Sequence, residues 1–400
     1  MPGPLQGIRI VDLTSVVLGP FATMTLADLG ADVIKVESPE GDMLRGIGIG
    51  RHPGMSPMHL QYNRNKRSVV LDLKSSGGKA AVLKLIASAD AVLHNMRPAA
   101  MKGLGLDYES VKAVKPDIVY CAAYGFGEDG PYAGKAAFDD IIQGVSGLAA
   151  IVEHISDMPR YVPSIIADKT TGLTLVYCCL AALLHKARTG EGQFVEIPMF
   201  ETMVAYNMVE HIWGQCFVPP TGPAGYTRVL APERKPHKTK DGYIGVLPYS
   251  DRHWRDLFVL AERPDLFDDP RFKSSNARTA NAGFVYGEVA RMMATKTTAE
   301  WIKLCDERSI PCAPVNRLMD LFDDPHLKAV GMFQEADHPS EGRIKTIRIA
   351  YSFGATPCAV TRQAPRLGEH SAEVLGELGM SEAEIAALRT SGAVRQVKQD

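Results

Sequence analysis

The chain has 400 residues, of which 46% are hydrophobic and 22% are charged. These proportions are typical of globular proteins and exclude a largely disordered chain. At roughly 150 residues per domain, the length predicts two or three domains. Lys and Arg together number 44 and Asp and Glu together number 46, which gives a net charge of -2. This balance argues against a nucleic acid as partner.

Secretion, membrane insertion and metal binding are not expected. Residues 1–7 contain neither the basic region nor the apolar region of a secretory signal. The longest apolar stretches, residues 141–152 and 172–184, are shorter than the ~18–20 residues of a membrane-spanning helix. The cysteines form no Cys-x-x-Cys pair and the histidines lack metal-ligand spacing, so we expect reduced core cysteines and no metal. We therefore expect a soluble, cytoplasmic protein without a membrane partner.

The N-terminal part of the chain alternates between strand and helix patterns. Residues 8–13 and 32–37 are β-rich runs, and residues 21–29 between them carry apolar side chains at helical spacing. A strand, a helix and a strand within about 30 residues predict a βαβ unit with parallel strands. The alternation continues over the first ~125 residues, which predicts a doubly wound α/β sheet. The further expected elements are strands at 68–73, 91–93 and 118–123 and helices at 78–87 and 108–114.

The remainder of the chain contains long helical patterns and two proline-rich stretches. Residues 171–186 have the strongest helical periodicity of the chain. The proline-rich stretches at 217–223 and 310–314 are typical of linkers. The expected domains are a large one over 1–218, a smaller α+β one over 224–325, and a segment over 326–400 that returns to the large domain. Further expected elements are a buried helix at 138–152, a strand at 242–247, helices at 251–261, 283–294 and 298–308, and a helical stretch at 371–388.

Three short motifs for nucleotide binding or hydrolysis are incomplete in this sequence. Residues 14–20, the first strand–helix turn, contain one glycine where a dinucleotide-binding turn needs three, so an NAD-dependent oxidoreductase is disfavoured. Residues 75–79 resemble a phosphate-binding loop, but Leu73 and Ala80 stand where glycine and a hydroxyl residue are required. Residues 144–148 lack the last glycine of a nucleophile elbow, which argues against a Ser-His-Asp hydrolase.

Asp168 lies between an apolar run and the most apolar helix of the chain. An Asp in this position is commonly a helix N-cap, which is worth ~1 kcal/mol. A carboxylate at a helix N-terminus is also expected to stay ionised, and a poorly hydrated carboxylate is a capable nucleophile toward an activated acyl group. The residues alone leave both interpretations open, because one side chain can serve in both ways.

Short segments spread in order over nearly the whole chain match one known family. They are Gly7–Thr14, Gly19–Pro20, Leu29–Glu37, Asn65–Ser68, Leu71–Lys74, Gly125–Gly127, Gly130–Tyr132, Ala167–Gly172, Thr189–Gln193 and Leu367–His370. On these segments the chain resembles the family III CoA-transferases, a group that includes formyl-CoA transferase, carnitine CoA-transferase and the α-methylacyl-CoA racemases. The resemblance implies a large α/β domain built from both chain ends, a smaller domain between them, and two chains interlocked as a homodimer.

The resemblance also implies that Asp168 is the catalytic nucleophile. It would attack an acyl-CoA thioester to give an aspartyl-acyl anhydride, and the released CoA thiolate would then form aspartyl-CoA and the free acid. An incoming carboxylate would reverse the sequence, and water must be excluded because hydrolysis would waste the activated acyl group. The implied partners are acyl-CoA and a small carboxylic acid, with no permanently bound cofactor. The implied CoA contacts are Val17, Leu18, Leu71, Asp72, Leu73, Lys74, Asn95, Met96, Arg97, Lys102, Ala136, Ala137, Phe138 and Asp139.

The sequence departs from two branches of the family. Val17 stands where formyl-CoA transferase has glutamine, and Gly222–Gly225 is the nearest match to its glycine-rich substrate loop, so formate–oxalate exchange is not expected. Phe138 and Asp139 stand where the racemases have a His-Asp pair, so the imidazole base is missing and CoA transfer is favoured over racemisation. An acyl-CoA racemase or epimerase, and a non-catalytic CoA-binding subunit, remain the alternatives.

Basic residues are the remaining candidates for anion binding. Ser38 and Gly103 replace arginines that are usual in the family, and Lys102 lies beside the second, so the contacts to the CoA phosphates are expected to differ. Positive charge alone makes several other residues candidates for contact with a dicarboxylate. These are Arg45, Arg64, Arg228, Arg234 and His237.

Overall fold

The computed structural model describes residues 3–395 and divides into two compact units. The larger unit is formed from Met1–Ser146, Pro163–Ala205 and Ala329–Asp400, so it joins segments from both ends of the chain. The smaller unit is formed from Gly147–Val162 and Tyr206–Lys328. Residues 147–162 and 206–218, which we expected in the large domain, thus belong to the smaller unit.

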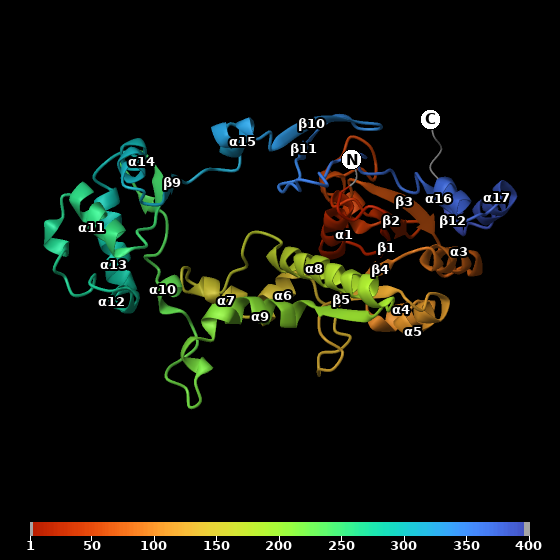
Figure 1. Ribbon diagram of the computed structural model, residues 1–400, viewed down its shortest axis with the longest axis horizontal. Helices are drawn as coiled ribbons and strands as arrows, with labels where there is room; N and C mark the ends of the chain where they lie inside the picture. The colour runs from red at the N-terminus through yellow and green to blue at the C-terminus, as the bar shows by residue number, and fades with distance from the viewer. Residues whose placement is uncertain (1–2, 396–400) are drawn as a thin grey trace. The chain divides into compact units, whose positions relative to one another are not determined.

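A seven-stranded sheet organises the larger unit (Figure 1). Its strand order is β12-β3-β2-β1-β4-β5-β6, in which β1 to β6 run parallel and β12 pairs antiparallel with β3. The order from β3 to β6 is that of a doubly wound nucleotide-binding sheet. The predicted α/β class with a mainly parallel sheet is therefore confirmed. The strands are β1 (Arg9–Leu13), β2 (Asp32–Glu37), β3 (Lys66–Leu71), β4 (Ala91–His94), β5 (Val119–Tyr124), β6 (Phe194–Pro198) and β12 (Val394–Arg395).

Both faces of this sheet are buried, as expected for parallel strands joined by helical crossovers. On one face, Val11 and Ile34 belong to a continuous core with Val82 and Leu85 of α3. On the other face, α8 packs against α1, β5 and β6. The helices of this unit are α1 (Leu18–Asp28), α2 (Pro57–Tyr62), α3 (Ser76–Ala87), α4 (Pro98–Leu104), α5 (Tyr108–Val114), α6 (Asp139–Val145), α8 (Ile166–Thr189), α16 (Ser371–Glu377) and α17 (Glu382–Thr390), with the hairpin β10 (Phe333–His338) and β11 (Gly342–Ile347).

The α8 helix is longer than the sequence predicted. It has 24 residues and is the one helix in the described part of the chain that is long and apolar enough to cross a membrane by length and composition. Half of its most apolar window is buried within the protein, and a core helix of a soluble protein passes the same test. Gly172 lets α8 approach α1 closely, because a Cβ atom at this position would lie 2.8 Å from the carbonyl oxygen of Leu18.

Two of the predicted helices are each divided by a left-handed glycine. The helix expected at 138–152 is wrong: Gly147, at φ +85°, separates α6 from α7 (Leu148–Glu153), and the two helices belong to different units. The stretch expected at 371–388 is divided between α16 and α17, with Gly379 at φ +76°. A glycine in this conformation ends a helix at little steric cost.

The smaller unit has its own core. Trp301 is fully buried among side chains from α11, α13 and α14, and its indole N–H donates to the Met293 carbonyl at 2.9 Å. This unit also contains the three-stranded sheet β7-β8-β9. Its elements are α10 (Thr227–Leu230), α11 (Asp251–Leu260), α12 (Ser275–Ala280), α13 (Ala282–Met293), α14 (Thr298–Glu307), β7 (His237–Lys238), β8 (Tyr243–Val246) and β9 (Cys312–Pro314), with α9 (Met199–His211) and α15 (Pro325–Ala329) at the unit borders.

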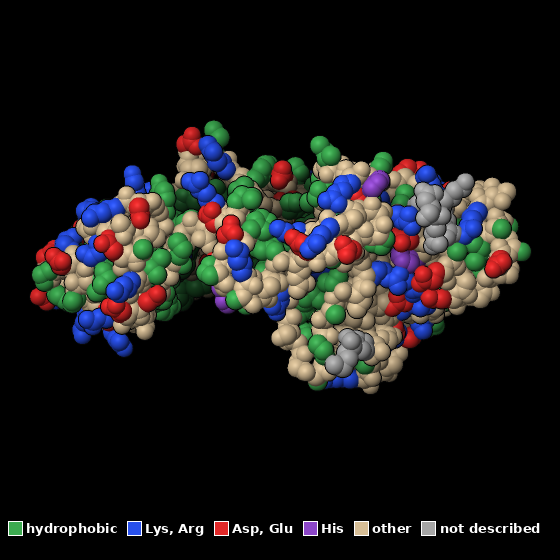
Figure 2. Space-filling view, turned by 90° about the horizontal axis from the view of Figure 1, so that it is seen from above, with side chains coloured by type: hydrophobic (Ala, Val, Ile, Leu, Met, Phe, Trp, Pro, Cys, Tyr) green, Lys and Arg blue, Asp and Glu red, His purple; other side chains and the backbone are tan. Residues whose placement is uncertain are grey.

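Charges of both signs are interspersed on the molecular surface. On the face shown in Figure 2, Lys and Arg side chains alternate with Asp and Glu side chains over each unit. This arrangement agrees with the nearly equal totals of 44 basic and 46 acidic residues.

Candidate active site

The candidate site lies where the order of the sheet reverses. The chain proceeds from β1 outward to β2 and β3, and then returns to place β4 on the other side of β1. Ligands of doubly wound sheets bind at such a point, beyond the carboxyl ends of the strands. The segments that follow the strand ends here are 14–17 after β1, 38–43 after β2, 72–74 after β3 and 95–97 after β4.

Asp168 lies in the first turn of α8, and its side chain is not the helix N-cap. The N-cap is Ile165, which makes no side-chain capping bond, so the N-cap interpretation of Asp168 is wrong. Its backbone N–H instead donates to Asp139 Oδ1 at 3.0 Å, while Gln143 Nε2 donates to Asp139 Oδ2 at 2.6 Å. The Asp139 side chain, from α6, therefore accepts a backbone N–H in the first turn of α8. The Asp168 carboxyl is left available for other contacts.

The environment of Asp168 favours its protonated form. Burial, and then the negative charges of Asp139 and Asp140, raise its pKa from 3.8 to about 7. We expected the helix N-terminus to keep this carboxylate ionised, but the loss of hydration outweighs the helix dipole. Near neutral pH, the side chain is thus divided between a proton-bearing form and a basic, poorly hydrated carboxylate.

Asp168 faces a cavity of about 430 Å³ beside the β1–α1 turn, which we call the Asp168 pocket. A second cavity of about 500 Å³ follows the ends of β1, β2 and β3. The two adjoin, because Ser15, Met43 and Met96 line both. Most of the residues expected at the site line one of these two cavities. The Asp168 pocket is lined by Val17, Leu18, Asn95, Met96, Arg97, Ala136, Ala137, Phe138 and Asp168, and the second cavity by Leu71, Asp72, Leu73, Lys74 and Met96.

The structure assigns distinct surroundings to several of these residues. Leu71 is fully buried in the sheet core, and Asp72 accepts the backbone N–H of Lys74 at 3.0 Å. Lys74 and Arg97 are exposed cations at the edges of the two adjoining cavities. Lys102 is exposed on α4 and is not part of either lining, so the structure does not bring it to the site.

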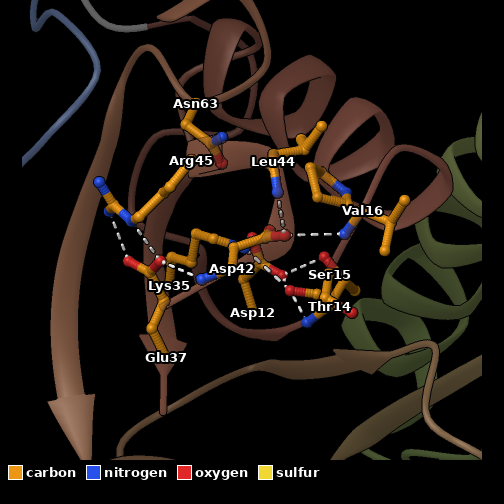
Figure 3. A network of polar contacts seen from close by, with 12 residues as sticks. Asp12, Thr14, Ser15, Val16, Lys35, Glu37, Asp42, Leu44, Arg45 and Asn63 are labelled. Atoms are coloured by element: carbon orange, nitrogen blue, oxygen red, sulfur yellow. Dashed lines mark hydrogen bonds and ion pairs between the residues drawn. The ribbon is translucent and has the colours of Figure 1, made fainter. Parts of the chain in front are cut away.

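The β1–α1 turn beside Asp168 is held in a strained conformation. Val16 has φ +65°, a left-handed conformation that is unfavourable for a β-branched residue. Its N–H donates to Asp42 Oδ1 at 3.0 Å, and Lys35 Nζ lies 2.8 Å from Asp42 Oδ2 (Figure 3). On the other side, the Asn95 side-chain amide accepts from Ser15 N–H at 2.8 Å and donates to Ser15 O at 2.7 Å. Asn95 thus serves to hold the turn.

The ion pair of Lys35 and Asp42, which we call the clamp because it holds this turn, is part of a buried network of three cations and three carboxylates. Lys35 and Lys66 are fully buried, and Lys66 Nζ lies 3.2 Å from Asp12 Oδ2. Burial would raise the pKa of Asp12, but Lys66 and Lys35 outweigh it and lower that pKa. The remaining pair is Glu37 with Arg45, at 2.7 Å. The six charges balance, which makes their burial tolerable.

Two arginines that we considered for a dicarboxylate are engaged within the core. Arg45 donates through Nε and Nη2 to the two oxygens of Glu37. Arg64 Nη2 lies 2.7 Å from Asp28 Oδ2, and both side chains are buried. The structure therefore contradicts a role in substrate binding for Arg45 and Arg64. Arg234 is exposed, and His237 is buried and stacked on Tyr286.

Sequence reasoning missed several residues of the Asp168 pocket. Met43, Lys135 and Met199 line it although they lie far apart in the sequence. Tyr62 is also near, because the Asp168 charge contributes to raising the pKa of its hydroxyl after burial. No motif marks these residues. Within residues 3–395, no group of three His, Cys, Asp or Glu side chains is arranged to hold a metal ion.

Comparison with known proteins gives one consistent result. The family model for CoA-transferase family III matches residues 5–371. The chain is 35% identical to the succinate–glutarate CoA-transferase of Agrobacterium fabrum over 94% of this chain and 96% of that protein. It is 31% identical to the human succinyl-CoA:glutarate CoA-transferase over 98% and 90%. A crystal structure of a CaiB/BaiF family protein from Brucella suis superposes with a TM-score of 0.79 at 31% identity, covering 94% of this chain and all of that one.

These matches extend over almost the whole chain and agree with the mainly parallel sheet described above. The sequence segments that suggested the family therefore identified it correctly. An enzyme of this family uses a CoA thioester as a substrate. The chain belongs to CoA-transferase family III.

Proposed function

We propose that this enzyme moves CoA from an acyl-CoA thioester to a free carboxylic acid, with Asp168 as the covalent nucleophile. The observation that carries the proposal is the position of Asp168: it is only 7% exposed, lines a cavity at the switch point of the sheet, and has a pKa raised by burial. A carboxylate that is poorly hydrated and basic is a strong nucleophile toward a thioester carbonyl.

The proposed steps exchange one acyl bond at a time. The Asp168 carboxylate attacks the thioester carbonyl, the C–S bond breaks, and an aspartyl-acyl anhydride and CoA thiolate are formed. The thiolate then attacks the Asp168 carbonyl, which releases the first acid and leaves aspartyl-CoA. The second acid attacks this thioester to form a new anhydride, and the thiolate attacks the acyl carbonyl to give the new acyl-CoA. Asp168 is regenerated, and no water, oxidant or proton is consumed.

The adjoining cavities support this chemistry. The Asp168 pocket is lined largely by apolar side chains such as Val17, Met96 and Met199, which suit the pantetheine arm and exclude water from the anhydride. Lys74 and Arg97 are exposed at the cavity edges, where they would meet the CoA phosphates. Since two relatives carry succinate and glutarate in their names, we propose a dicarboxylic acid as the substrate.

The test is CoA exchange monitored by mass spectrometry. Purified protein is incubated with succinyl-CoA and a panel of acids that includes glutarate, and new CoA esters are identified. We expect glutaryl-CoA to form, hydroxylamine to convert Asp168 to a hydroxamate during turnover, and Asp168→Ala to abolish exchange with the fold retained. Asp129→Ala, which removes an exposed carboxylate, is the matched control. Full exchange by Asp168→Ala would contradict the proposal, and α-deuteration in heavy water without an acceptor acid would indicate a racemase.

We also propose that the enzyme is an interlocked homodimer. The exposed side of α8 carries Leu173, Tyr177 and Leu184, which are 50%, 60% and 52% exposed. Exposed apolar side chains in a row along one helix are typical of an interface. Light scattering after size-exclusion chromatography is expected to give twice the chain mass of 43.5 kDa. A monomer at micromolar concentration would contradict the dimer.

A further inference from the structure

The Asp168 pocket contains a cation that the proposed steps do not use. Its charged lining residues are Asp168, Arg97 and Lys135. We assign Arg97 to the CoA phosphates together with Lys74, which lines the adjoining cavity. Within residues 3–395, no Asp or Glu side chain forms an ion pair with Lys135. The charge of Lys135 is therefore left unbalanced in the cavity that Asp168 faces.

An aromatic cluster, and not a carboxylate, positions the Lys135 side chain. Its Nζ lies 4.0 Å from the centre of the Tyr132 ring. The ring of Tyr132 packs against Phe126 and Phe200, with centres 5.4 Å and 6.2 Å apart, and the two phenylalanine rings pack on each other at 5.6 Å. An ammonium group held over an aromatic face keeps its positive charge. The N–H donors that point away from the ring remain available for an oxyanion.

The segment that carries Lys135 packs closely on the end of β5. A Cβ atom at Gly125 would lie 2.7 Å from the Ala137 Cβ and 3.6 Å from the Lys135 carbonyl oxygen. Residues 136–138, which follow Lys135, also line the pocket that Asp168 faces. Lys135 and Asp168 thus lie on the wall of one cavity within the larger unit.

We propose that Lys135 binds the second carboxylate of a dicarboxylic acid whose first carboxyl group reacts at Asp168. The inference rests on the proposed function, because it assigns a recognition residue to the acid substrate of that reaction. A dicarboxylic acid carries its second carboxylate at the far end of a short carbon chain. That charge needs a cation inside a pocket whose lining is otherwise largely apolar.

Arg228, which charge alone also made a candidate for a dicarboxylate, is placed differently. It belongs to the smaller unit, where its Nε donates to the Tyr286 hydroxyl at 3.0 Å. Lys135 lines the same cavity as the reacting carboxyl group, so one small acid can contact both.

The experiment compares Lys135→Met with Lys112→Met. Lys112 is a matched control, because it is exposed on α5 with its Nζ 5.5 Å from the centre of the Tyr108 ring, and it lines neither cavity. In CoA exchange between succinyl-CoA and glutarate, we expect Lys135→Met to raise the KM for glutarate by roughly tenfold, the scale of one charge-assisted hydrogen bond. The KM for succinyl-CoA is expected to rise as well, because the succinyl group also has a second carboxylate. Both KM values are expected to stay unchanged in Lys112→Met, and Lys135→Arg is expected to fall between wild type and Lys135→Met.

Binding of free CoA separates a carboxylate contact from a phosphate contact. Isothermal titration of the full chain with CoA is expected to give the same Kd for wild type, Lys135→Met and Lys112→Met. Weaker binding of CoA by a folded Lys135→Met enzyme would show that Lys135 contacts a CoA phosphate, and would overturn the assignment. An unchanged KM for glutarate in that variant would also overturn it.

Titration of the CoA-saturated enzyme with two acids separates this inference from the proposed function. Glutarate is expected to bind more tightly than pentanoate, which lacks the second carboxylate, and Lys135→Met is expected to remove this difference. Equal or absent binding of the two acids by the wild type would overturn the inference even where exchange proceeds through Asp168. Absence of CoA exchange in the wild type would refute the proposed function, and the titration would still test Lys135.

Discussion

Replacing Asp168 with asparagine is expected to stabilise the protein above neutral pH. Burial, with smaller contributions from Asp139 and Asp140, raises the pKa of Asp168 from 3.8 to about 7, so ionisation costs more in the folded state than in the hydrated, unfolded chain. At 1.36 kcal/mol per pH unit, this difference corresponds to about 4 kcal/mol of lost stability. Asparagine resembles the protonated carboxyl in shape and is neutral at every pH, so it avoids this cost.

The sign of the effect follows from which state holds the proton. Below about pH 4 both states are protonated, and Asp168 costs nothing. Between there and about pH 7 the folded chain keeps a proton that the unfolded chain has released, so wild-type stability falls as the pH rises. Above about pH 8, Asp168 is ionised in both states and the loss of unfolding free energy is complete. The gain from Asp168→Asn should therefore grow from near zero to at most about 4 kcal/mol.

Equilibrium urea unfolding of wild type and Asp168→Asn at about pH 5 and about pH 8 tests this prediction. Asp129→Asn removes the same charge from an exposed position and controls for net charge. We expect the midpoint of Asp168→Asn to exceed that of wild type by far more at the higher pH, and exchange activity to be lost. Equal gains at both pH values, or a variant less stable than wild type at about pH 8, would show that Asp168 is not desolvated as the structure indicates.

Three further substitutions test the surroundings of Asp168, each by its free energy of unfolding in urea. Val16→Gly is expected to change stability by less than about 1 kcal/mol, because relief of the left-handed conformation offsets the added freedom of the unfolded chain; a loss above about 2 kcal/mol would contradict strain at this position. Lys35→Met leaves Asp42 buried without its cation and is expected to cost about 3–5 kcal/mol. Arg9→Met, which removes ion pairs with the partly exposed Asp32 and Glu377, is expected to cost less than about 1 kcal/mol; equal costs would contradict the buried pair. Gly172→Ala is expected to cost about 1–3 kcal/mol and to lower the exchange rate, because its methyl group would force α8 away from α1; an unchanged rate would show that this spacing does not position Asp168.

The central sheet could be predicted from sequence because its strands are short, apolar and regularly spaced. The range 32–37 is reproduced without change, β1 begins one residue later than the expected range 8–13, and 118–123 shifts by one residue. The helix at 138–152 failed because apolar residues recur on both sides of Gly147, such as Ile142 and Leu148, and hide the turn there, where only a glycine tolerates the positive φ without strain. Strand β6 was not predicted, although Gly190, at φ +80°, ends α8 before it. Its five residues include Glu196 and end at Pro198, and glutamate and proline are uncommon inside strands. Cytoplasmic location stays a prediction.

The candidate site was only partly predictable, because it depends on which charges the fold buries. The family pattern indicated Asp168 and the segments at the strand ends, but not the clamp formed by Lys35 and Asp42 on Val16. A signal for it was present: Lys35 lies inside a strand whose parallel neighbours bury both faces, and a lysine there requires a carboxylate partner. The sequence could not identify Asp42 as that partner, since it lies in the loop beyond the strand.

The properties that make Asp168 reactive also make it costly to the fold. A hydrated aspartate would be stable but only weakly nucleophilic, whereas burial raises its pKa to about 7 and with it the basicity of the carboxylate. The rest of the larger unit must supply enough stability to hold this group and the strained turn beside it. The fully buried ion pairs of Lys35 and Lys66 fix that turn from within the core and maintain the strain at Val16. An enzyme in which Asp168 were hydrated would gain stability and lose the reactive carboxylate.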